Sequence, residues 1–228
     1  KDEDTLMVAM AMGGDTETTS GYGRQLRVWK RGTPFSDAEV IFEVPADHMT
    51  AQATLFADGN ANHVVIGDAV TIFQSDYYLL GDNNKVSRLH LPEAFQMSTI
   101  HKGWVVGLLQ ADWKDSPQGS LVGFRITDLD EPPGEATTIF QPNQLQAVQS
   151  LLGLGVLKTG EALYFSILDD VVGQLVRASF NGEEWVTKNV ALPGNGTTSV
   201  VAAAGSTDTI IAKYESFVQP PTLFASEG

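Results

Sequence analysis

The feature that most constrains the fold of this chain is a repeat of about fifty residues. Short runs rich in Val, Ile, Leu, Thr and aromatic residues are separated by Gly, Pro, Asp and Asn, and helical periodicity is hard to find. The runs recur in one order: a buried strand, a strand with charged positions, a turn and a short apolar strand. The final strands are predicted at 39–44, 87–91, 136–141 and 185–192, and their midpoints are spaced by 48, 50 and 51 residues. Such regularity is typical of stacked supersecondary units.

The other strands of each unit follow the same order. Second strands are predicted at 6–10, 63–67, 104–110, 163–168 and 208–214, and third strands at 25–30, 77–80, 121–127, 174–180 and 222–225. Units of four short strands at this period describe β-propeller blades. An immunoglobulin-like sandwich also has many strands, but it lacks a fifty-residue repeat. The sequence therefore predicts an all-β chain, a partial, open β-propeller of about four to five four-stranded blades.

The predicted blades cover approximately residues 1–44, 45–92, 93–141, 142–193 and 194–228, of which the first and last are incomplete. The first group lacks its innermost strand, and the last stops at its third. Because closed propellers have about 4–8 blades, we expect the chain to be a fragment of a longer protein. Uncovered faces around 6–10 and 222–225 lead us to expect self-association of the fragment.

The composition narrows the classes of function. The 228 residues include 14 basic and 28 acidic side chains, a net charge of −14, and the sequence has no cluster of Lys and Arg that would bind nucleic acid. No apolar run approaches the ~20 residues of a membrane span. There is no cysteine, which excludes disulfides and Cys-based zinc sites. The compartment, cytoplasmic or periplasmic, stays open.

Three strings resemble a known family. TSGY at 19–22 followed by VWKRGTP at 28–34, PQGSL at 117–121 followed by TDLD at 127–130, and YESFVQPPTLF at 214–224 are similar to stretches in the propeller of prolyl oligopeptidase family serine peptidases. The last string is the most specific. The resemblance runs from about Thr5 to Phe224 and departs from the family pattern most at Gly23, where a Pro would be usual.

The resemblance implies a parent of two domains. One is an α/β-hydrolase domain with a Ser-Asp-His triad, and the other is a seven-bladed propeller that sits over the active site and limits access to short peptides. Only the later part of the propeller is matched, so the hydrolase domain is expected to lie outside this chain. The partners implied are that missing domain and, in the parent, short peptide substrates.

The chain itself carries no complete catalytic motif. A hydrolase nucleophile elbow, Gly-x-Ser-x-Gly, does not occur. Ser120 and Ser206 each follow a glycine, and we interpret both as turn residues. The four histidines lack metal-binding spacing: His63 and His90 are predicted on strands with structural roles, and His48 and His101 are predicted to open strands beside loops, where they could line a channel mouth.

The remaining polar and aromatic clusters are interpreted as structural. Asp169 and Asp170 form a predicted hairpin turn rather than the two converging acids of a glycosidase. The segment 82–84 lacks the ligand alternation of a calcium loop, and the glycines at 13–14 and 153–155 are too few for a phosphate loop. The four tryptophans, Trp29, Trp104, Trp113 and Trp185, are expected in packing roles. Trp113 is expected to be the most exposed of them. No catalytic, cofactor-binding or metal-binding residue is predicted.

Two classes of function fit this sequence. The first is a non-catalytic propeller segment of a prolyl oligopeptidase-like serine peptidase, which gates peptide access and is inactive alone. The second is a stand-alone propeller that binds a protein or small molecule. A glycan-processing propeller enzyme lacks identifiable convergent acids. An elbow encoded downstream of Gly228 would favour the first class.

Overall fold

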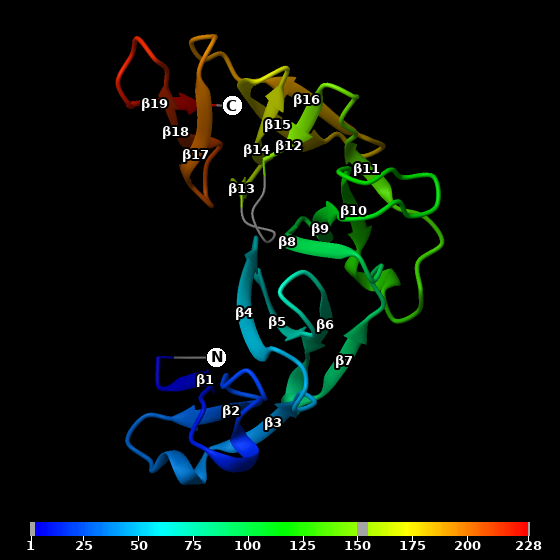
Figure 1. Cartoon of the computed structure of the whole chain (residues 1–228), viewed down its shortest axis with the longest axis vertical. Helices are drawn as coiled ribbons and strands as arrows, with labels where there is room; N and C mark the ends of the chain where they lie inside the picture. The colour runs from blue at the N-terminus through cyan, green and yellow to red at the C-terminus, as the bar shows by residue number, and fades with distance from the viewer. Residues whose placement is uncertain (1–2, 150–154, 228) are drawn as a thin grey trace. The chain divides into compact units, whose positions relative to one another are not determined.

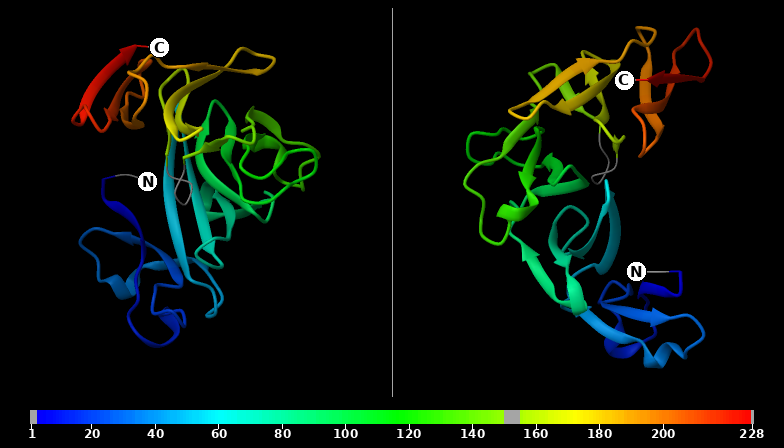
Figure 2. Two further views of the ribbon diagram at one scale, coloured as in Figure 1. Left: turned by 45° about the horizontal axis from the view of Figure 1, so that its top comes forward. Right: turned by 180° about the vertical axis from the view of Figure 1, so that it is seen from behind.

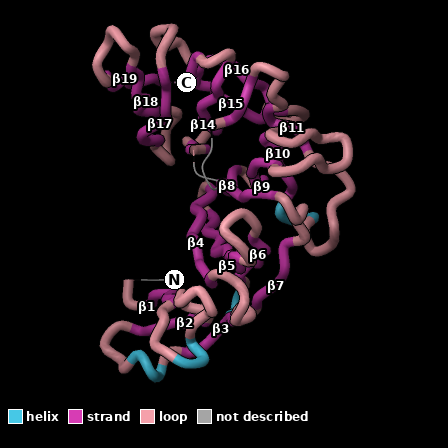
Figure 3. The backbone as a smooth tube through the Cα atoms, in the orientation of Figure 1, coloured by secondary structure: helices cyan, strands magenta, loops and turns pink. Residues whose placement is uncertain are grey.

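The structure, a computed structural model, describes residues 3–149 and 155–227, and its strands pair antiparallel within five sheets. Figure 3 shows that helix is confined to short segments of the loops. Among the described residues, no helix is long and apolar enough to cross a membrane. The chain divides into two compact units, of residues 1–94 with 127–133 and of residues 95–126 with 134–228.

Unit 1 contains two sheets (Figure 1). The first has three strands, and the second has four strands in chain order. Their bounds are β1 Thr5–Ala9, β2 Gln25–Lys30 and β3 Glu39–Glu43, then β4 Thr50–Asp58, β5 Ala61–Ala69, β6 Ser75–Leu80 and β7 Val86–Leu89. β4 and β5 pair along nine residues, and Figure 2 shows them in the left view as a long hairpin.

The core of unit 1 lies between these two sheets. Leu26 of β2 packs with Ala51, Ile66 and Leu80 of the second sheet. Backbone bonds add to this contact, since the carbonyl of Gly23 accepts from the N–H of Ala51 at 3.2 Å. A Cβ at Gly23 would lie 2.7 Å from the backbone nitrogen of residue 10, so a larger residue here would require the backbone to shift.

Unit 2 contains three sheets, two of them large and one of three strands. Their bounds are β8 Phe95–His101, β9 Trp104–Leu109, β10 Leu121–Arg125 and β11 Thr137–Phe140; β12 Gln146–Val148, β13 Val156–Lys158, β14 Leu163–Asp169, β15 Val172–Phe180 and β16 Trp185–Asn189; and β17 Thr197–Ala203, β18 Thr209–Glu215 and β19 Thr222–Glu227.

β14 shows why its residues form a central strand. Leu163 and Phe165 join the cluster that includes Trp104 and Leu121 of the preceding sheet. The alternate residue Tyr164 packs on the other face, with Ile210 and Ala212 of β18. Because side chains of a strand alternate between faces, a run that is apolar throughout is buried on both sides.

The sequence prediction of the strands is confirmed, with corrections at several ends. Each predicted blade range contains the strands of one sheet, although the division into blades itself stays a prediction. β16 ends at Asn189 rather than at residue 192, and β18 begins at Thr209, so Asp208 lies in a turn. Strand ends fray over one or two residues, and just beyond β16 the N–H of Val190 still donates to the carbonyl of Leu175 at 2.8 Å.

Candidate functional site

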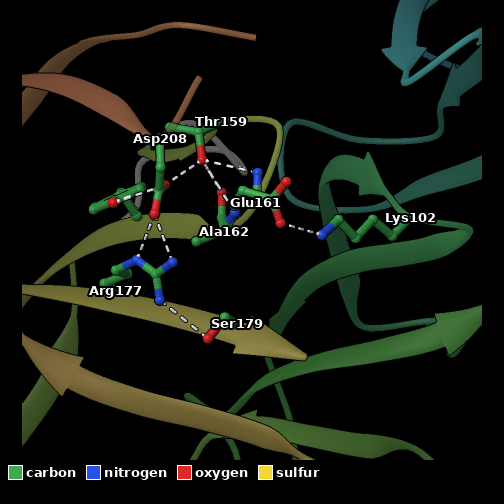
Figure 4. Close-up of polar contacts among 8 residues, drawn as sticks. Lys102, Thr159, Glu161, Ala162, Arg177, Ser179 and Asp208 are labelled. Atoms are coloured by element: carbon green, nitrogen blue, oxygen red, sulfur yellow. Dashed lines mark hydrogen bonds and ion pairs between the residues drawn. The ribbon is translucent and has the colours of Figure 1, made fainter. Parts of the chain in front are cut away.

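A polar cluster that we name the Asp208 junction contains Asp208, Arg177 and Thr159 (Figure 4). The hydroxyl of Tyr164 also bonds to Asp208 and completes the junction. Asp208 lies in the turn between β17 and β18, and Thr159 lies in the turn between β13 and β14. The N–H of Gly160 also donates to the carbonyl of residue 207 at 3.3 Å. The junction therefore joins two sheets of unit 2.

Each carboxylate oxygen of Asp208 accepts two hydrogen bonds. Oδ1 accepts from the hydroxyls of Thr159 at 2.6 Å and Tyr164 at 2.9 Å. Oδ2 accepts from Nε and Nη2 of Arg177 at 3.0 and 2.5 Å. Tyr164 and Arg177 are opposite each other in the β14–β15 register, which places their side chains on the same face of the sheet.

Thr159 and Arg177 are themselves held in place. The hydroxyl oxygen of Thr159 accepts from the N–H groups of Glu161 and Ala162 at 3.2 and 3.0 Å, so the turn fixes the rotamer of this side chain. Nη1 of Arg177 donates to the hydroxyl of Ser179 at 3.1 Å. The carboxylate thus meets donors whose positions are set in advance.

The electrostatics of the junction follow from these contacts. Burial by itself would raise the pKa of Asp208, but hydrogen bonds from Thr159, Arg177 and Tyr164 outweigh burial and hold the pKa below its usual value. Burial, reinforced by the bond to Asp208, raises the pKa of the Tyr164 hydroxyl. A carboxylate with four donors and low proton affinity is a poor general base, so we interpret the junction as structural.

Unit 1 contains a carboxylate that is more deeply buried than Asp208. Asp68 of β5 is 4% exposed, and Oδ1 lies 2.7 Å from Nδ1 of His48. Burial raises the pKa of Asp68, although the hydrogen bond from His48 lowers it in part. For the Asp68–His48 pair to act as the base of a catalytic triad, a nucleophilic side chain would have to lie beside the ring of His48. Among the described residues, no Ser or Thr side chain is hydrogen-bonded to His48.

The structure places the other predicted histidines on or beside strands. His63 lies in β5 and is half-buried. His90 follows the end of β7, so its placement within a strand was wrong by one residue. His48 precedes β4 as predicted, whereas His101 ends β8 rather than opening a strand, and it is only 2% exposed. The ring of His101 lies 6.2 Å from that of Trp185 on β16, a contact 84 residues away that the local sequence did not indicate.

Of the serine and carboxylate candidates, only some lie where the sequence put them. A hairpin turn lies between β14 and β15 as predicted, but Asp170 and Val171 form it, and Asp169 is the last residue of β14, paired with Val172, so the predicted turn was one residue early. Ser206 lies in an exposed turn. Ser120 closes a turn directly before β10, as its N–H donates to the carbonyl of Pro117 at 3.2 Å, but it is fully buried, so its hydroxyl is out of reach of a substrate.

The remaining candidates are distributed among turns and packing positions. Residues 82–84 form a short helical turn, η3 Asp82–Asn84. Of the glycine pair, Gly13 precedes and Gly14 begins another short helical turn, η1 Gly14–Thr16. Gly153 and Leu154 fall outside the described residues. Trp104 and Trp185 are buried and Trp29 and Trp113 half-buried, which agrees with packing roles. No group of three metal-binding side chains occurs within the described part of the chain.

The comparisons with known proteins decide the family. The family described as "Prolyl oligopeptidase, N-terminal beta-propeller domain" matches residues 2–227, nearly the whole chain. The chain belongs to this family. Its five antiparallel sheets are therefore propeller sheets, and the prediction of a propeller segment is confirmed.

Relatives are longer than this chain. An uncharacterized peptidase, y4nA, of Sinorhizobium fredii is 27% identical over all of the chain, and an uncharacterized peptidase, RP174, of Rickettsia prowazekii is 26% identical over 97% of it. A post-proline cleaving enzyme from Rickettsia typhi has the same fold over 98% of the chain, with a TM-score of 0.86 at 22% identity. The chain spans about a third of the length of each, 32–34%.

Proposed function

We propose that this chain is the non-catalytic propeller segment of a prolyl oligopeptidase-like serine peptidase. In this proposal the segment gates access of peptides to a Ser-Asp-His site on a hydrolase domain outside the chain. The observation that carries it is the family match over residues 2–227 in a chain that spans a third of its peptidase relatives.

The residues of the chain support a division of labour. No Gly-x-Ser-x-Gly elbow occurs in the sequence. The half-buried carboxylate of Asp208 and the buried one of Asp68 are both engaged, Asp208 by four donors and Asp68 by His48. Attack by serine on the scissile carbonyl and hydrolysis of the acyl-enzyme would therefore belong to the hydrolase domain.

The mechanism proposed for the segment is steric and dielectric. Sheets that cover an active site admit a short, extended peptide and exclude a folded protein. They also keep bulk water from the reacting groups, which strengthens the electrostatic interactions within the site. Hydrogen-bonded links between sheets, such as the Asp208 junction, would give the cover the rigidity that exclusion requires.

The experiment compares this chain with the longer protein encoded by its reading frame. Both are assayed with a fluorogenic proline-containing peptide and with a folded protein as substrates. We expect the longer protein to cleave the peptide but not the folded protein, and the chain alone to cleave neither. A serine-directed inhibitor should abolish the activity of the longer protein.

Two results would contradict the proposal. Peptide turnover by residues 1–228 alone would show that the segment is catalytic. Equal cleavage of the peptide and the folded protein by the longer protein would show that the segment does not restrict access. The same outcome in a variant with the elbow serine replaced would reveal a contaminating peptidase.

A further inference from the structure

Two identical dipeptides in unit 2 are held in different ways by the fold. The sequence contains two Asn–Gly pairs, Asn181-Gly182 and Asn195-Gly196. The first pair lies in the turn between β15 and β16, and the second lies directly before β17. Both asparagines are exposed. A difference in the reactivity of the two pairs would therefore come from the structure around each glycine.

An Asn–Gly pair is the dipeptide in which an asparagine side chain is most open to attack by its own backbone. The nitrogen of the following residue forms a bond to Cγ, the bond from Cγ to the side-chain nitrogen breaks, and this nitrogen leaves as ammonia with the proton of the attacking N–H. Water then opens the cyclic imide at either carbonyl, which leaves an aspartyl or an isoaspartyl residue. Glycine has no Cβ to shield its nitrogen or to restrict rotation of the peptide unit, so the ring closes most readily there.

The nitrogen of Gly182 is unobstructed. Apart from its chain neighbours, no described atom lies within 4 Å of the position that a Cβ would take at Gly182, and φ of this residue is 106°. Its N–H donates no hydrogen bond to the described residues. Ring closure requires the peptide unit between residues 181 and 182 to rotate, and the open turn leaves room for that rotation.

The side chain of Asn181 is polarised by its own turn. Its Oδ1 accepts from the N–H groups of Glu183 and Glu184, each at 2.9 Å. When the nitrogen of Gly182 attacks Cγ, negative charge develops on Oδ1. The two donors stabilise that charge in the way that backbone N–H groups do in an oxyanion hole. The turn thus favours the attack.

The second pair is held by packing and by hydrogen bonds. A Cβ at Gly196 would lie 2.4 Å from the carbonyl oxygen of Glu215 and 2.5 Å from the ring of Tyr214, so the backbone here is closely covered. The carbonyl of Gly196 accepts from the N–H of Gly173 at 2.8 Å, and the carbonyl of residue 194 accepts from the hydroxyl of Tyr214 at 2.7 Å. The peptide unit before Gly196 cannot rotate without disturbing these contacts.

We propose that Asn181 is a site of spontaneous deamidation and that the fold protects Asn195 from the same reaction. Conversion adds a negative charge beside two glutamates, in a chain whose net charge is already −14. The isoaspartyl product also adds a backbone carbon to the turn that joins Phe180 and Trp185, which face each other in the β15–β16 register. The reaction is independent of the proposed function, because it needs only water and the residues of this turn.

The experiment uses the longer protein encoded by the reading frame of this chain. One sample is incubated folded in mildly alkaline buffer, and a second is incubated in the same buffer with guanidinium chloride. Aliquots are acidified, digested and mapped by mass spectrometry, with chromatography to separate the aspartyl from the isoaspartyl peptides. At each asparagine the rate in the folded protein is divided by the rate in denaturant, so that each site serves as its own reference.

We expect the relative rate at Asn195 to be at least about tenfold lower than that at Asn181, because reaction at the packed site must wait for local opening. Equal relative rates at the two sites, or a faster reaction at Asn195, would overturn the inference.

Asn181→Ser is the control variant, since its hydroxyl oxygen still offers an acceptor to the N–H groups of the turn. The variant should yield no deamidated product in the peptide that contains residue 181, and the rate at Asn195 should be unchanged. A product that persists in this peptide would place the reaction at another residue and would also overturn the inference. If the variant does not fold, the comparison of Asn181 with Asn195 in the unmodified sequence decides alone.

Discussion

Unit 1 and unit 2 each hold a carboxylate largely away from water, and the two behave in opposite ways. Asp208 has two hydroxyl donors and a guanidinium, and its pKa is lowered. Asp68 has the His48 ring as its partner, lies opposite Asp76 in the β5–β6 register, and its pKa is raised. Burial acts in the same direction on both, so the number and charge of the donors decides the sign.

The difference indicates different uses of the same residue type. A carboxylate that is more stable as the anion in the folded state strengthens the structure that supplies its donors. A carboxylate that is less stable as the anion weakens its surroundings at neutral pH. Asp208 therefore stabilises the contact between two sheets, whereas the ionised Asp68 lowers the free energy of unfolding at neutral pH.

The largest expected effect is that of Asp208→Ala. The substitution leaves the guanidinium of Arg177 and two hydroxyls without their acceptor, and we expect the free energy of unfolding to fall by about 3 kcal/mol. Urea denaturation followed by the fluorescence of Trp104 and Trp185, both in unit 2, measures the change. A loss below about 0.5 kcal/mol, the range of surface substitutions, would contradict the role of the junction.

The second effect is on the pH dependence of stability. Protonation of Asp208 should cost less free energy of unfolding than Asp208→Ala, because the protonated side chain stays in place. Since the pKa of Asp208 is lowered on folding, its contribution is present above the unfolded value near 3.9 and is lost as the pH falls through the folded value. For Asp68 the folded pKa is raised, so stability falls as the pH rises above about 3.9 toward the folded value.

Two variants separate these contributions. The difference in unfolding free energy between the parent and Asp208→Asn should shrink as the pH is lowered from 7 to 3. Asp68→Asn should instead gain relative to the parent as the pH rises over the same range. Parallel curves for both variants would show that the two carboxylates do not differ as described.

Asp68→Asn gives the next smaller effect at pH 7. The amide keeps a hydrogen-bonding atom beside His48 and removes the burial penalty of the anion, so we expect a loss of at most about 1 kcal/mol. The matched change Asp208→Asn should cost about 2 kcal/mol, because it removes an anion that accepts charge-assisted bonds from Arg177. If Asp68→Asn is the more destabilising of the two, the contrast between a stabilising Asp208 and a destabilising Asp68 is wrong.

The sequence predicts the strands well and the junction poorly, for one physical reason. Alternating apolar residues and polar turn residues such as Asp170 act locally, so the strands and the β14–β15 turn are visible in the sequence to within one residue. Asp208 lies 31 residues from Arg177 and 49 from Thr159, and only tertiary folding brings them together. The available signal was Arg177 itself, a charged residue among the buried Leu175, Val176 and Ala178.

The smallest expected effect comes from an ion pair beside the junction. Glu161 lies 3.0 Å from Lys102, but these side chains are 66% and 44% exposed. Because water screens such a pair, Glu161→Gln should change the unfolding free energy by less than about 0.5 kcal/mol, and 0.5 M salt should change it little further. The backbone N–H of residue 161 still donates to Thr159 in this variant, so the turn is preserved. A loss as large as that of Asp208→Asn would mean that charge near the junction matters more than burial and the number of donors, and the contrast between Asp68 and Asp208 would need another cause.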